Sequence, residues 1–334
     1  MSQLRVLISR PDRLGDVILS TPIPREIKKK YPESFVALLL RPYTKDIYLN
    51  NPYVDAIITY DPEDKNNNLL EKVKEIRQFK FTHALMLLPN ERVNYMLFLS
   101  GIFNRIGVGY KFYQFITFVQ SVSRKKYIPL RHEADYCMDL ARKLGIATDN
   151  LDCEIHLTEN EKQSVQKIRK KILKDGNVVV GIHSTSGKSA PNWEAERYLE
   201  LLHKLKNISN IKIVVTDNIP PEILDNIEGV EYPNKGSDLR SSILNFAALD
   251  LLVSASTGPM HIAAALKVKT VALFCRLKSC SPELWGPKGN SSVIIMPDKE
   301  NCNKFCNDDP KHCRFKDRHN ISVEEVYEKI VQFI

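Results

Sequence analysis

The sequence predicts an α/β protein of two domains, each with a mainly parallel sheet, and three observations support this prediction. The chain has 334 residues, more than one hydrophobic core usually holds. Short apolar segments typical of buried strands alternate with segments of helical periodicity in both halves. The alternation stops after Leu157 and restarts near residue 175.

The first half begins with a buried-type strand and continues in alternation. The predicted strands are Arg5–Ser9, Phe35–Leu40, Ala56–Tyr60 and His83–Leu88. The predicted helices are Pro22–Lys30, Leu69–Phe79 and Ala134–Leu144, the last of which ends at Gly145. We assign residues 1–157 to an N-terminal domain.

A polar, lysine-rich helix, Glu159–Leu173, connects the halves within residues 158–174. The second half repeats the pattern, with strands at Val178–Ile182, Ile211–Val215, Leu251–Ser254 and Thr270–Phe274. Helices are predicted at Glu194–Leu205, Leu239–Leu249 and Pro259–Leu266. We assign residues 175–320 to a C-terminal domain and residues 321–334, with helix Val323–Phe333, to a closing segment. Two such units are Rossmann-like, so we expect ligands at the carboxyl ends of the strands, in a cleft between the domains.

The composition describes a globular protein with an anionic partner. Hydrophobic residues make up 43% and charged residues 26%, which excludes a disordered chain. The net charge of +8 favours phosphorylated small molecules, nucleic acid or an acidic membrane surface. No nucleic-acid recognition motif accompanies this charge. The sequence has neither a signal-peptide core after Met1 nor about 18 consecutive apolar residues, so we expect a cytoplasmic protein.

A basic and aromatic segment runs from Asn104 to His132 without any Asp or Glu. Its cations are Arg105, Lys111, Arg124, Lys125, Lys126 and Arg131, and its aromatics are Tyr110, Phe112, Tyr113, Phe115, Phe118 and Tyr127. Cations beside exposed aromatics suit a membrane surface or an amphiphilic anionic ligand. The segment is equally compatible with an ordinary helix that has a solvated basic end.

Seven cysteines in a cytoplasmic chain are expected to be reduced thiols. Cys302, Cys306 and Cys313 lie close in sequence, with His312 and His319 nearby. Their spacing differs from the paired-cysteine pattern of zinc sites. We therefore expect plain thiols or a local loop contact, and no metal site.

The turn after the first strand carries charged residues where a dinucleotide-binding fingerprint would carry three glycines. Arg10, Asp12, Arg13 and Asp16 surround Gly15, and this turn argues against an NAD-dependent oxidoreductase, which the doubled α/β pattern alone would suggest. Asp16 is suited to act as a general base on an acceptor hydroxyl. Taken alone, the turn favours a simpler interpretation, in which Asp16 is the N-cap of the following helix.

A second turn, Ser256-Thr257-Gly258-Pro259-Met260-His261, joins a strand to a helix. The backbone N–H groups and the helix dipole predict an anion site at this turn. A third polar loop, His183 to Lys188, contains Ser184, Thr185 and Gly187 and suits a diphosphate. The loop lacks the glycine spacing of a P-loop, and a plain surface loop is the alternative interpretation.

Together these elements resemble the ADP-heptose:lipopolysaccharide heptosyltransferase family (glycosyltransferase family 9). The first motif reads Arg13-Leu14-Gly15-Asp16-Val17-Ile18-Leu19-Ser20-Thr21-Pro22. The second runs from Ser256 to Leu266, and a late Trp285-Gly286-Pro287 also agrees. The order of these elements is similar over nearly the whole chain.

The resemblance implies a GT-B fold, two Rossmann-like domains facing across a cleft, and an inverting glycosyltransferase that needs no metal ion or cofactor. The donor, expected to be ADP-heptose, would lie on the C-terminal domain. The acceptor, a lipopolysaccharide core or related anionic glycolipid, would lie on the N-terminal domain at the cytoplasmic face of the inner membrane. Asp16 takes the position of the catalytic base. The donor residues implied are Ser184, Thr185, Lys188, Ser256, Thr257, Gly258, Pro259, Met260 and His261. The acceptor residues are Arg10, Arg13, Gly15, Lys111, Arg124 and Lys125.

Two departures from the family pattern leave alternatives open. Ser256 stands where the family usually has Asp, and Pro191 stands where a Lys normally precedes the Trp by two residues. The chain could therefore use a different nucleotide sugar, or bind a nucleotide sugar or glycolipid without turning it over.

Overall fold

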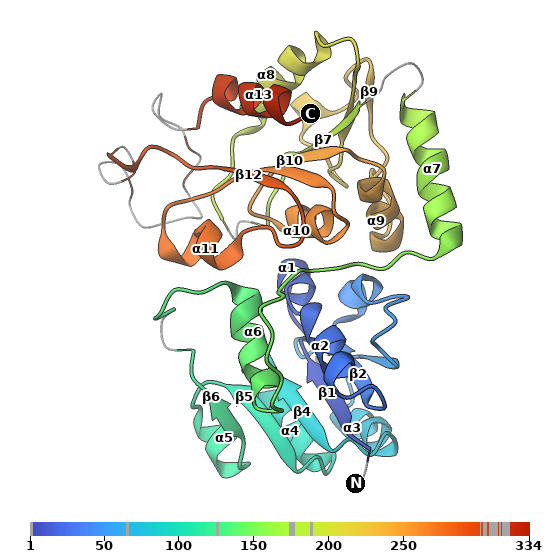
Figure 1. The fold of residues 1–334 in the computed structure, drawn as a ribbon, viewed down its shortest axis with the longest axis vertical. Coiled ribbons are helices and arrows are strands. Elements are labelled where there is room, and N and C mark those ends of the chain that lie inside the picture. The colour runs from blue at the N-terminus through green and yellow to red at the C-terminus, as the bar shows by residue number, and fades with distance from the viewer. Residues whose placement is uncertain are drawn as a thin grey trace. The chain divides into compact units, whose positions relative to one another are not determined.

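The computed structural model describes residues 3–64, 67–124, 127–173, 178–187, 190–300, 302, 306, 313, 315 and 321–334. The chain divides into two compact units, Met1–His156 and Leu157–Ile334. Both are α/β units with helices packed on a central sheet (Figure 1).

The first unit contains a six-stranded sheet in the order β3-β2-β1-β4-β5-β6. Every neighbouring pair of strands is parallel. The strands are β1 Arg5–Ser9, β2 Phe35–Leu40, β3 Ala56–Thr59, β4 His83–Met86, β5 Asn104–Val108 and β6 Gln120–Val122. The helices are α1 Leu14–Ile18, α2 Pro22–Lys30, α3 Leu69–Gln78, α4 Glu91–Leu99, α5 Phe112–Ile116 and α6 Glu133–Arg142. This strand order is that of a dinucleotide-binding fold, with the topological switch point between β1 and β4.

The second unit repeats this topology in a parallel sheet of order β12-β11-β10-β7-β8-β9. Its strands are β7 Val178–His183, β8 Ile211–Val215, β9 Val230–Glu231, β10 Leu251–Ala255, β11 Lys269–Leu273 and β12 Ser292–Ile295. Its helices are α7 Glu159–Leu173, α8 Ala195–Lys206, α9 Leu239–Ala247, α10 Gly258–Ala265, α11 Pro282–Trp285 and α13 Val323–Phe333. The switch point here lies between β7 and β10.

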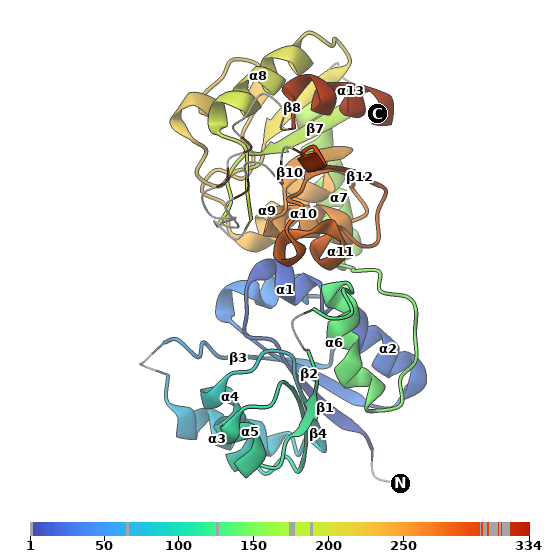
Figure 2. The ribbon, with the colours of Figure 1, turned by 90° about the vertical axis from the view of Figure 1, so that its left-hand side faces the viewer.

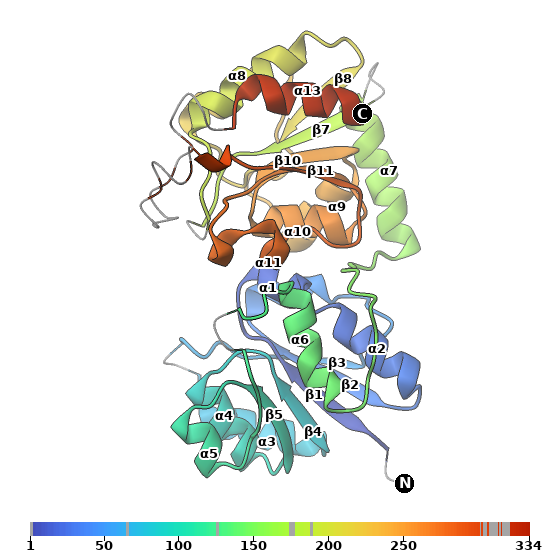
Figure 3. The ribbon, with the colours of Figure 1, turned by 60° about the vertical axis from the view of Figure 1, so that its left-hand side comes forward.

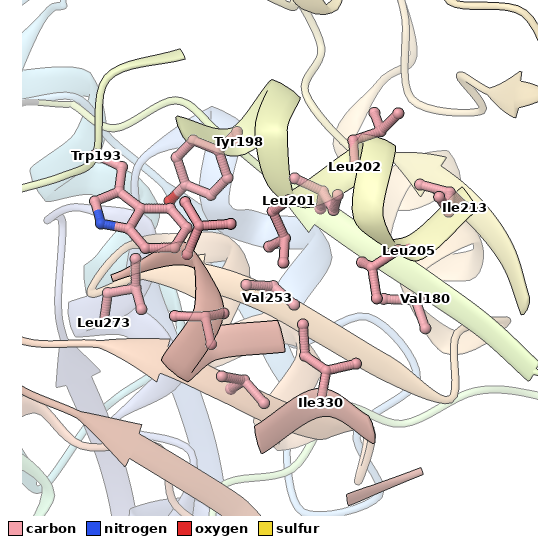
Figure 4. Packing of buried hydrophobic residues seen from close by; sticks show 14 of the residues in the cluster. Val180, Trp193, Tyr198, Leu201, Leu202, Leu205, Ile213, Val253, Leu273 and Ile330 are labelled. Carbon is pink, nitrogen blue, oxygen red and sulfur yellow. The ribbon is translucent and has the colours of Figure 1, made fainter. Parts of the chain in front are cut away.

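Side chains on both faces of the sheet in the second unit are buried under helices. Val180 and Val253 point toward α8 and α13, where they pack with Leu201, Leu205 and Ile330 in one buried cluster (Figure 4). Helices α8 and α13 cover this face, and α9 and α10 cover the opposite face (Figures 2 and 3). Successive strand residues point to opposite faces, so a continuous apolar run serves a sheet that is covered on both sides.

The structure confirms the α/β alternation and corrects it in the basic and aromatic segment. That segment is not one helix: it forms strand β5, the short helix α5 and strand β6. Arg105 lies inside β5, is buried, and donates hydrogen bonds to the carbonyl oxygens of Ile102 and Thr117. Its guanidinium therefore links the start of β5 to the end of α5 and is not part of a solvated helix end. Within the described ranges, no helix is both long and apolar enough to cross a membrane.

Candidate active site

In the first unit, the turn after β1 leaves the sheet at the switch point. Arg10 follows β1 directly and is only 2% exposed. Its Nη1 donates to the carbonyl oxygen of Leu87, which follows β4, at 2.9 Å. Its Nη2 donates to Asp16 Oδ1 at 2.7 Å and to Glu133 Oε1 at 3.0 Å. Arg10 thus ties together both strands of the switch point and two carboxylates.

Asp16 is the third residue of α1 and does not cap it. The N-cap is Arg13, and no side chain makes the capping hydrogen bond there. The interpretation of Asp16 as a simple cap is therefore wrong. Its carboxylate instead faces the guanidinium of Arg10.

The pKa of Asp16 is raised from its ordinary value to about 6. Burial is the main cause, and the negative charges of Asp12 and Glu133 act in the same direction, while Arg10 opposes them. A carboxylate with a pKa close to neutral can both accept and release a proton at physiological pH. The residue at the end of the switch-point turn is thus suited to general base catalysis.

Glu133 is a member of this network that the sequence did not reveal. It is fully buried at the start of α6, and its Oε1 accepts hydrogen bonds from Arg10 and, at 2.9 Å, from Nη1 of Arg124. It is the first acidic residue after the basic and aromatic segment. Its pairing with Arg10, 123 positions earlier, leaves no local pattern in the sequence.

The other predicted acceptor residues are distributed unevenly. Arg124 reaches the network through Glu133. Gly15 and Arg13 lie at the start of α1, with Arg13 exposed. Lys111 is exposed and directly precedes α5. Helix α5 follows β5, which is separated from β1 by β4 in the sheet. Lys125 lies outside the described residues.

In the second unit, two of the predicted donor-binding turns begin side by side. His183, the last residue of β7, is paired with Ser254 of β10, so the loops that follow leave the sheet as neighbours at the switch point. Thr257 is the N-cap of α10, and its hydroxyl lies 3.1 Å from the hydroxyl of Ser254 instead of capping the helix. Simple side-chain capping by Thr257 is therefore not its role.

The remaining residues of this turn differ in their surroundings. Gly258 and Pro259 are the first two residues of α10, and the first amides of a helix have no partner within it. Ser256 and His261 are buried. Met260 is fully buried against Ala272 and Phe274, so its side chain belongs to the core.

Asp217 is a second residue that the sequence did not single out. It follows β8 and is fully buried. Its carboxylate accepts four hydrogen-bond donors: the backbone N–H and the hydroxyl of both Ser184 and Thr185, at 2.6–3.2 Å. The polar Thr216-Asp217 pair at the carboxyl end of an apolar strand was the available signal.

These bonds give the loop after β7 a defined shape. Asn192 fixes it further, since its Nδ2 donates to the carbonyl oxygen of Ser184 at 2.6 Å, and Tyr198 donates to its Oδ1 at 2.7 Å. The loop is therefore more than a plain surface turn. Lys188, predicted to contact the phosphates, lies outside the described residues.

Cys302, Cys306 and Cys313 are free thiols. The backbone N–H of Cys306 donates to the carbonyl oxygen of Cys302 at 2.9 Å, as in a helical turn. Among the residues described, no group of three His, Cys, Asp or Glu side chains is arranged to hold a metal ion. His312 and His319 lie outside that part of the chain.

The chain is similar to known glycosyltransferases. A putative glycosyltransferase of Haemophilus influenzae is 24% identical over 304 residues, 85% of this chain and 86% of its own length. The structure of a family 9 glycosyltransferase from Veillonella parvula is similar with a TM-score of 0.80, at 19% identity, over 98% of this chain and 96% of its own.

Two solved Escherichia coli proteins are also similar. ADP-heptose LPS heptosyltransferase II has a TM-score of 0.76 at 18% identity, over 98% of both chains. Heptosyltransferase WaaC, solved with ADP, has a TM-score of 0.69 at 14% identity, over 98% of this chain and 99% of its own. These likenesses confirm the predicted GT-B class of fold. The sequence profile of glycosyltransferase family 9 (heptosyltransferase) matches residues 70–314, and the chain therefore belongs to that family.

Proposed function

We propose that this protein transfers a heptose from ADP-heptose to a lipopolysaccharide core or a related glycolipid, with inversion at the anomeric carbon. Two observations about relatives support the choice of sugar: one similar structure is named an ADP-heptose LPS heptosyltransferase, and another was solved with ADP. The observation that carries the chemistry is the carboxylate of Asp16, whose pKa is raised to about 6 at the switch point of the first unit.

In this proposal Asp16 is the general base. Its ionised carboxylate takes the proton from the acceptor hydroxyl, and the hydroxyl oxygen attacks the anomeric carbon of the donor. The bond from that carbon to the diphosphate oxygen breaks, and the electron pair leaves with ADP. Arg10 holds the carboxylate in place by a hydrogen bond from its buried guanidinium.

The donor diphosphate would bind at the start of α10 in the second unit. The backbone amides of Gly258 and Met260 and the positive end of the helix dipole favour a negatively charged group there. Ser256, Thr257, Pro259 and His261 complete the turn. Lys188 would add a positive charge, and with these groups the leaving diphosphate would need no metal ion.

Ser184 and Thr185 have a different part in this proposal. Their hydroxyl protons are donated to Asp217. We propose that they shape the loop beside the donor and that contact with the diphosphate would come through their hydroxyl oxygens or after a rearrangement of these bonds.

The acceptor would lie on the first unit, at the cytoplasmic face of the inner membrane. Arg124 shares the partner Glu133 with Arg10, which in turn donates to Asp16. Arg13 and Lys111 are exposed cations that could contact phosphate or carboxylate groups of a glycolipid core, together with Gly15 and Lys125.

A second candidate function is binding of a nucleotide sugar without transfer. It is favoured by Ser256 in place of the Asp usual in the family, and by the engagement of Ser184 and Thr185 with Asp217. Isothermal titration that detects ADP affinity, while no core acceptor receives a sugar, would support this alternative.

The test of the leading proposal has two steps on the full-length protein. Melting temperatures are measured with ADP-, UDP-, GDP- and dTDP-sugars, since a ligand at 100 times its Kd stabilises the native state by about 2.7 kcal/mol. Transfer to truncated lipopolysaccharide cores is then followed by mass spectrometry. We expect stabilisation by ADP-heptose and a product enlarged by one heptose. Stabilisation by another nucleotide sugar alone would exclude ADP-heptose as the donor.

A further inference from the structure

An exposed aromatic face lies on the first unit, on α4, on α5 and on the residues that precede β5 and β6. It consists of Phe98, Phe103, Phe112, Phe115, Ile116 and Phe118. Four of these phenylalanines are mostly solvent-exposed: Phe103 at 89%, Phe112 and Phe115 at 78%, and Phe118 at 81%. Single exposed apolar residues are normal, but five phenylalanines within 21 residues of chain need an explanation.

The contacts in this part of the fold bring these side chains to one region. Phe112, Phe115 and Ile116 lie on the same side of α5, because residues three and four apart share a helix face. Gln120 pairs with Ile106, so Phe118 and Phe103 both precede the same end of the paired strands β5 and β6.

Helix α4 joins this region from the other side. The side chain of Asn94 donates to the hydroxyl of Thr117 at 2.9 Å, and the rings of Tyr95 and Tyr113 lie 6.4 Å apart. The guanidinium of Arg105 lies 5.0 Å from the ring centroid of Phe98. Helices α4 and α5 are neighbours in all three views (Figures 1, 2 and 3).

Positive charge borders the aromatic face. Lys111 is exposed directly before α5. Arg77 is exposed, and its guanidinium donates to the carbonyl oxygen of Leu99 at the end of α4, at 2.6 and 3.1 Å. Burial raises the pKa of Tyr113 in α5, and Glu91, the first residue of α4, is near enough for its charge to add to that rise. Between Glu91 and Glu133 the sequence contains no further Asp or Glu. The surroundings thus attract an anionic partner.

We propose that the aromatic face docks on an anionic lipid bilayer, with the phenylalanine rings inserted among the acyl chains and Lys111 and Arg77 against the headgroups. Exposed Phe side chains flanked by Lys and Arg match this surface in both polarity and charge. A symmetric pairing with a second copy is disfavoured, because it would bring Lys111 and Arg77 of both copies into one interface. The inference rests on the proposed function in one respect: a glycolipid acceptor requires the enzyme at a membrane.

The test is a flotation assay of the full-length protein with vesicles of phosphatidylcholine, alone or mixed with phosphatidylglycerol. We expect binding to the anionic vesicles that weakens as salt rises. The double variant Phe112→Ser, Phe115→Ser should lower this affinity at least about tenfold, since it removes two large apolar side chains from the interface. Lys111→Glu should lower it at least about fivefold.

The matched control is Ile219→Ser, which removes an equally exposed apolar side chain, 82% exposed, from the second unit and should leave vesicle binding unchanged. Unaltered binding of the double variant, or equal binding of the wild type to neutral and anionic vesicles, would overturn the proposal. So would a concentration-dependent dimer in analytical ultracentrifugation that the double variant abolishes, because that result assigns the face to a second copy.

This assay contains neither sugar nucleotide nor acceptor, so its outcome is independent of the proposed transfer. Conversely, transfer to a water-soluble core oligosaccharide should be the same in the double variant and in the wild type. Failure of transfer in both proteins would refute the proposed function and leave the docking result intact.

Discussion

The buried guanidinium of Arg10 donates a 2.7 Å hydrogen bond to the carboxylate of Asp16, six residues further along the chain. The same nitrogen atom lies 3.0 Å from Glu133, so one cation holds two carboxylates. Burial and the second carboxylate raise the pKa of Asp16, and Arg10 limits the rise. The balance of these effects sets the pKa of the proposed base. The charges of Arg10 and Glu133 can each be removed by a single substitution.

The first prediction concerns pH. With a pKa of about 6, Asp16 should be ionised above that value, so kcat/KM for sugar transfer should fall about tenfold per pH unit below it. The folded-state pKa is above the ordinary value of 3.8, so the folded protein binds the proton more tightly than the unfolded chain does. Stability contributed by Asp16 should therefore decline as the pH rises from about 4 to 6. Asp16→Asn should lack this decline in thermal melting curves.

The second prediction concerns Arg10. Arg10→Met removes the guanidinium that Asp16 and Glu133 share and leaves buried Glu133 with Arg124 alone, which should cost about 3–5 kcal/mol of unfolding free energy. Because Arg10 lowers the pKa of Asp16, its loss should also move the acidic limb of the pH–rate profile upward. Arg10→Lys retains the charge without the forked geometry and should show a smaller change in both quantities. A profile that stays in place in both variants would disprove the coupling.

The third prediction concerns Glu133. Glu133→Gln removes a negative charge that raises the pKa of Asp16, so the acidic limb should move to lower pH. The control is Glu26→Gln, which alters another buried ion pair of the same unit, with Arg25. If Glu26→Gln shifts the profile as far as Glu133→Gln does, the effect is structural and not electrostatic.

The fourth prediction concerns Asp217 in the second unit. Asp217→Asn puts an amide group opposite four donors and should cost about 2–3 kcal/mol of unfolding free energy. The loop of Ser184 and Thr185 should lose its shape, and the Kd for ADP should rise. Asp225→Asn, at a more exposed pair with Lys235 in the same unit, is the control and should change neither quantity appreciably.

The regular parts of this fold could be predicted because their signals are local. Predicted strand Phe35–Leu40 and predicted helices Pro22–Lys30 and Glu159–Leu173 agree with the structure at both ends. Apolar runs and helical periodicity within a few residues were sufficient there. The elements between Asn104 and Val122 were not recognised, since exposed aromatic residues interrupt the periodicity of β5, α5 and β6.

The site could be predicted only in part, for a related reason. Asp16 and Thr257 follow strands at the switch points, so motif and topology identify them from sequence. Glu133 lies at the start of α6 and binds Arg10, the partner of Asp16. Asp217 follows β8 and binds the loop of Ser184 and Thr185, which lies beside the turn of Thr257. The partners in such pairs depend on the three-dimensional register of the sheets: the Thr216-Asp217 pair after an apolar strand marks a candidate residue without naming its partners, and Glu133 has no local signal at all.

The central claim is that Asp16 is the base, and the variant Asp16→Asn tests it most directly. The account predicts that heptose transfer falls about 100-fold to 10,000-fold, while the Kd for ADP and the melting temperature at neutral pH are not impaired. The amide keeps the size of the side chain and cannot accept the acceptor proton. Transfer at close to the wild-type rate by a folded, ADP-binding Asp16→Asn protein would contradict the account.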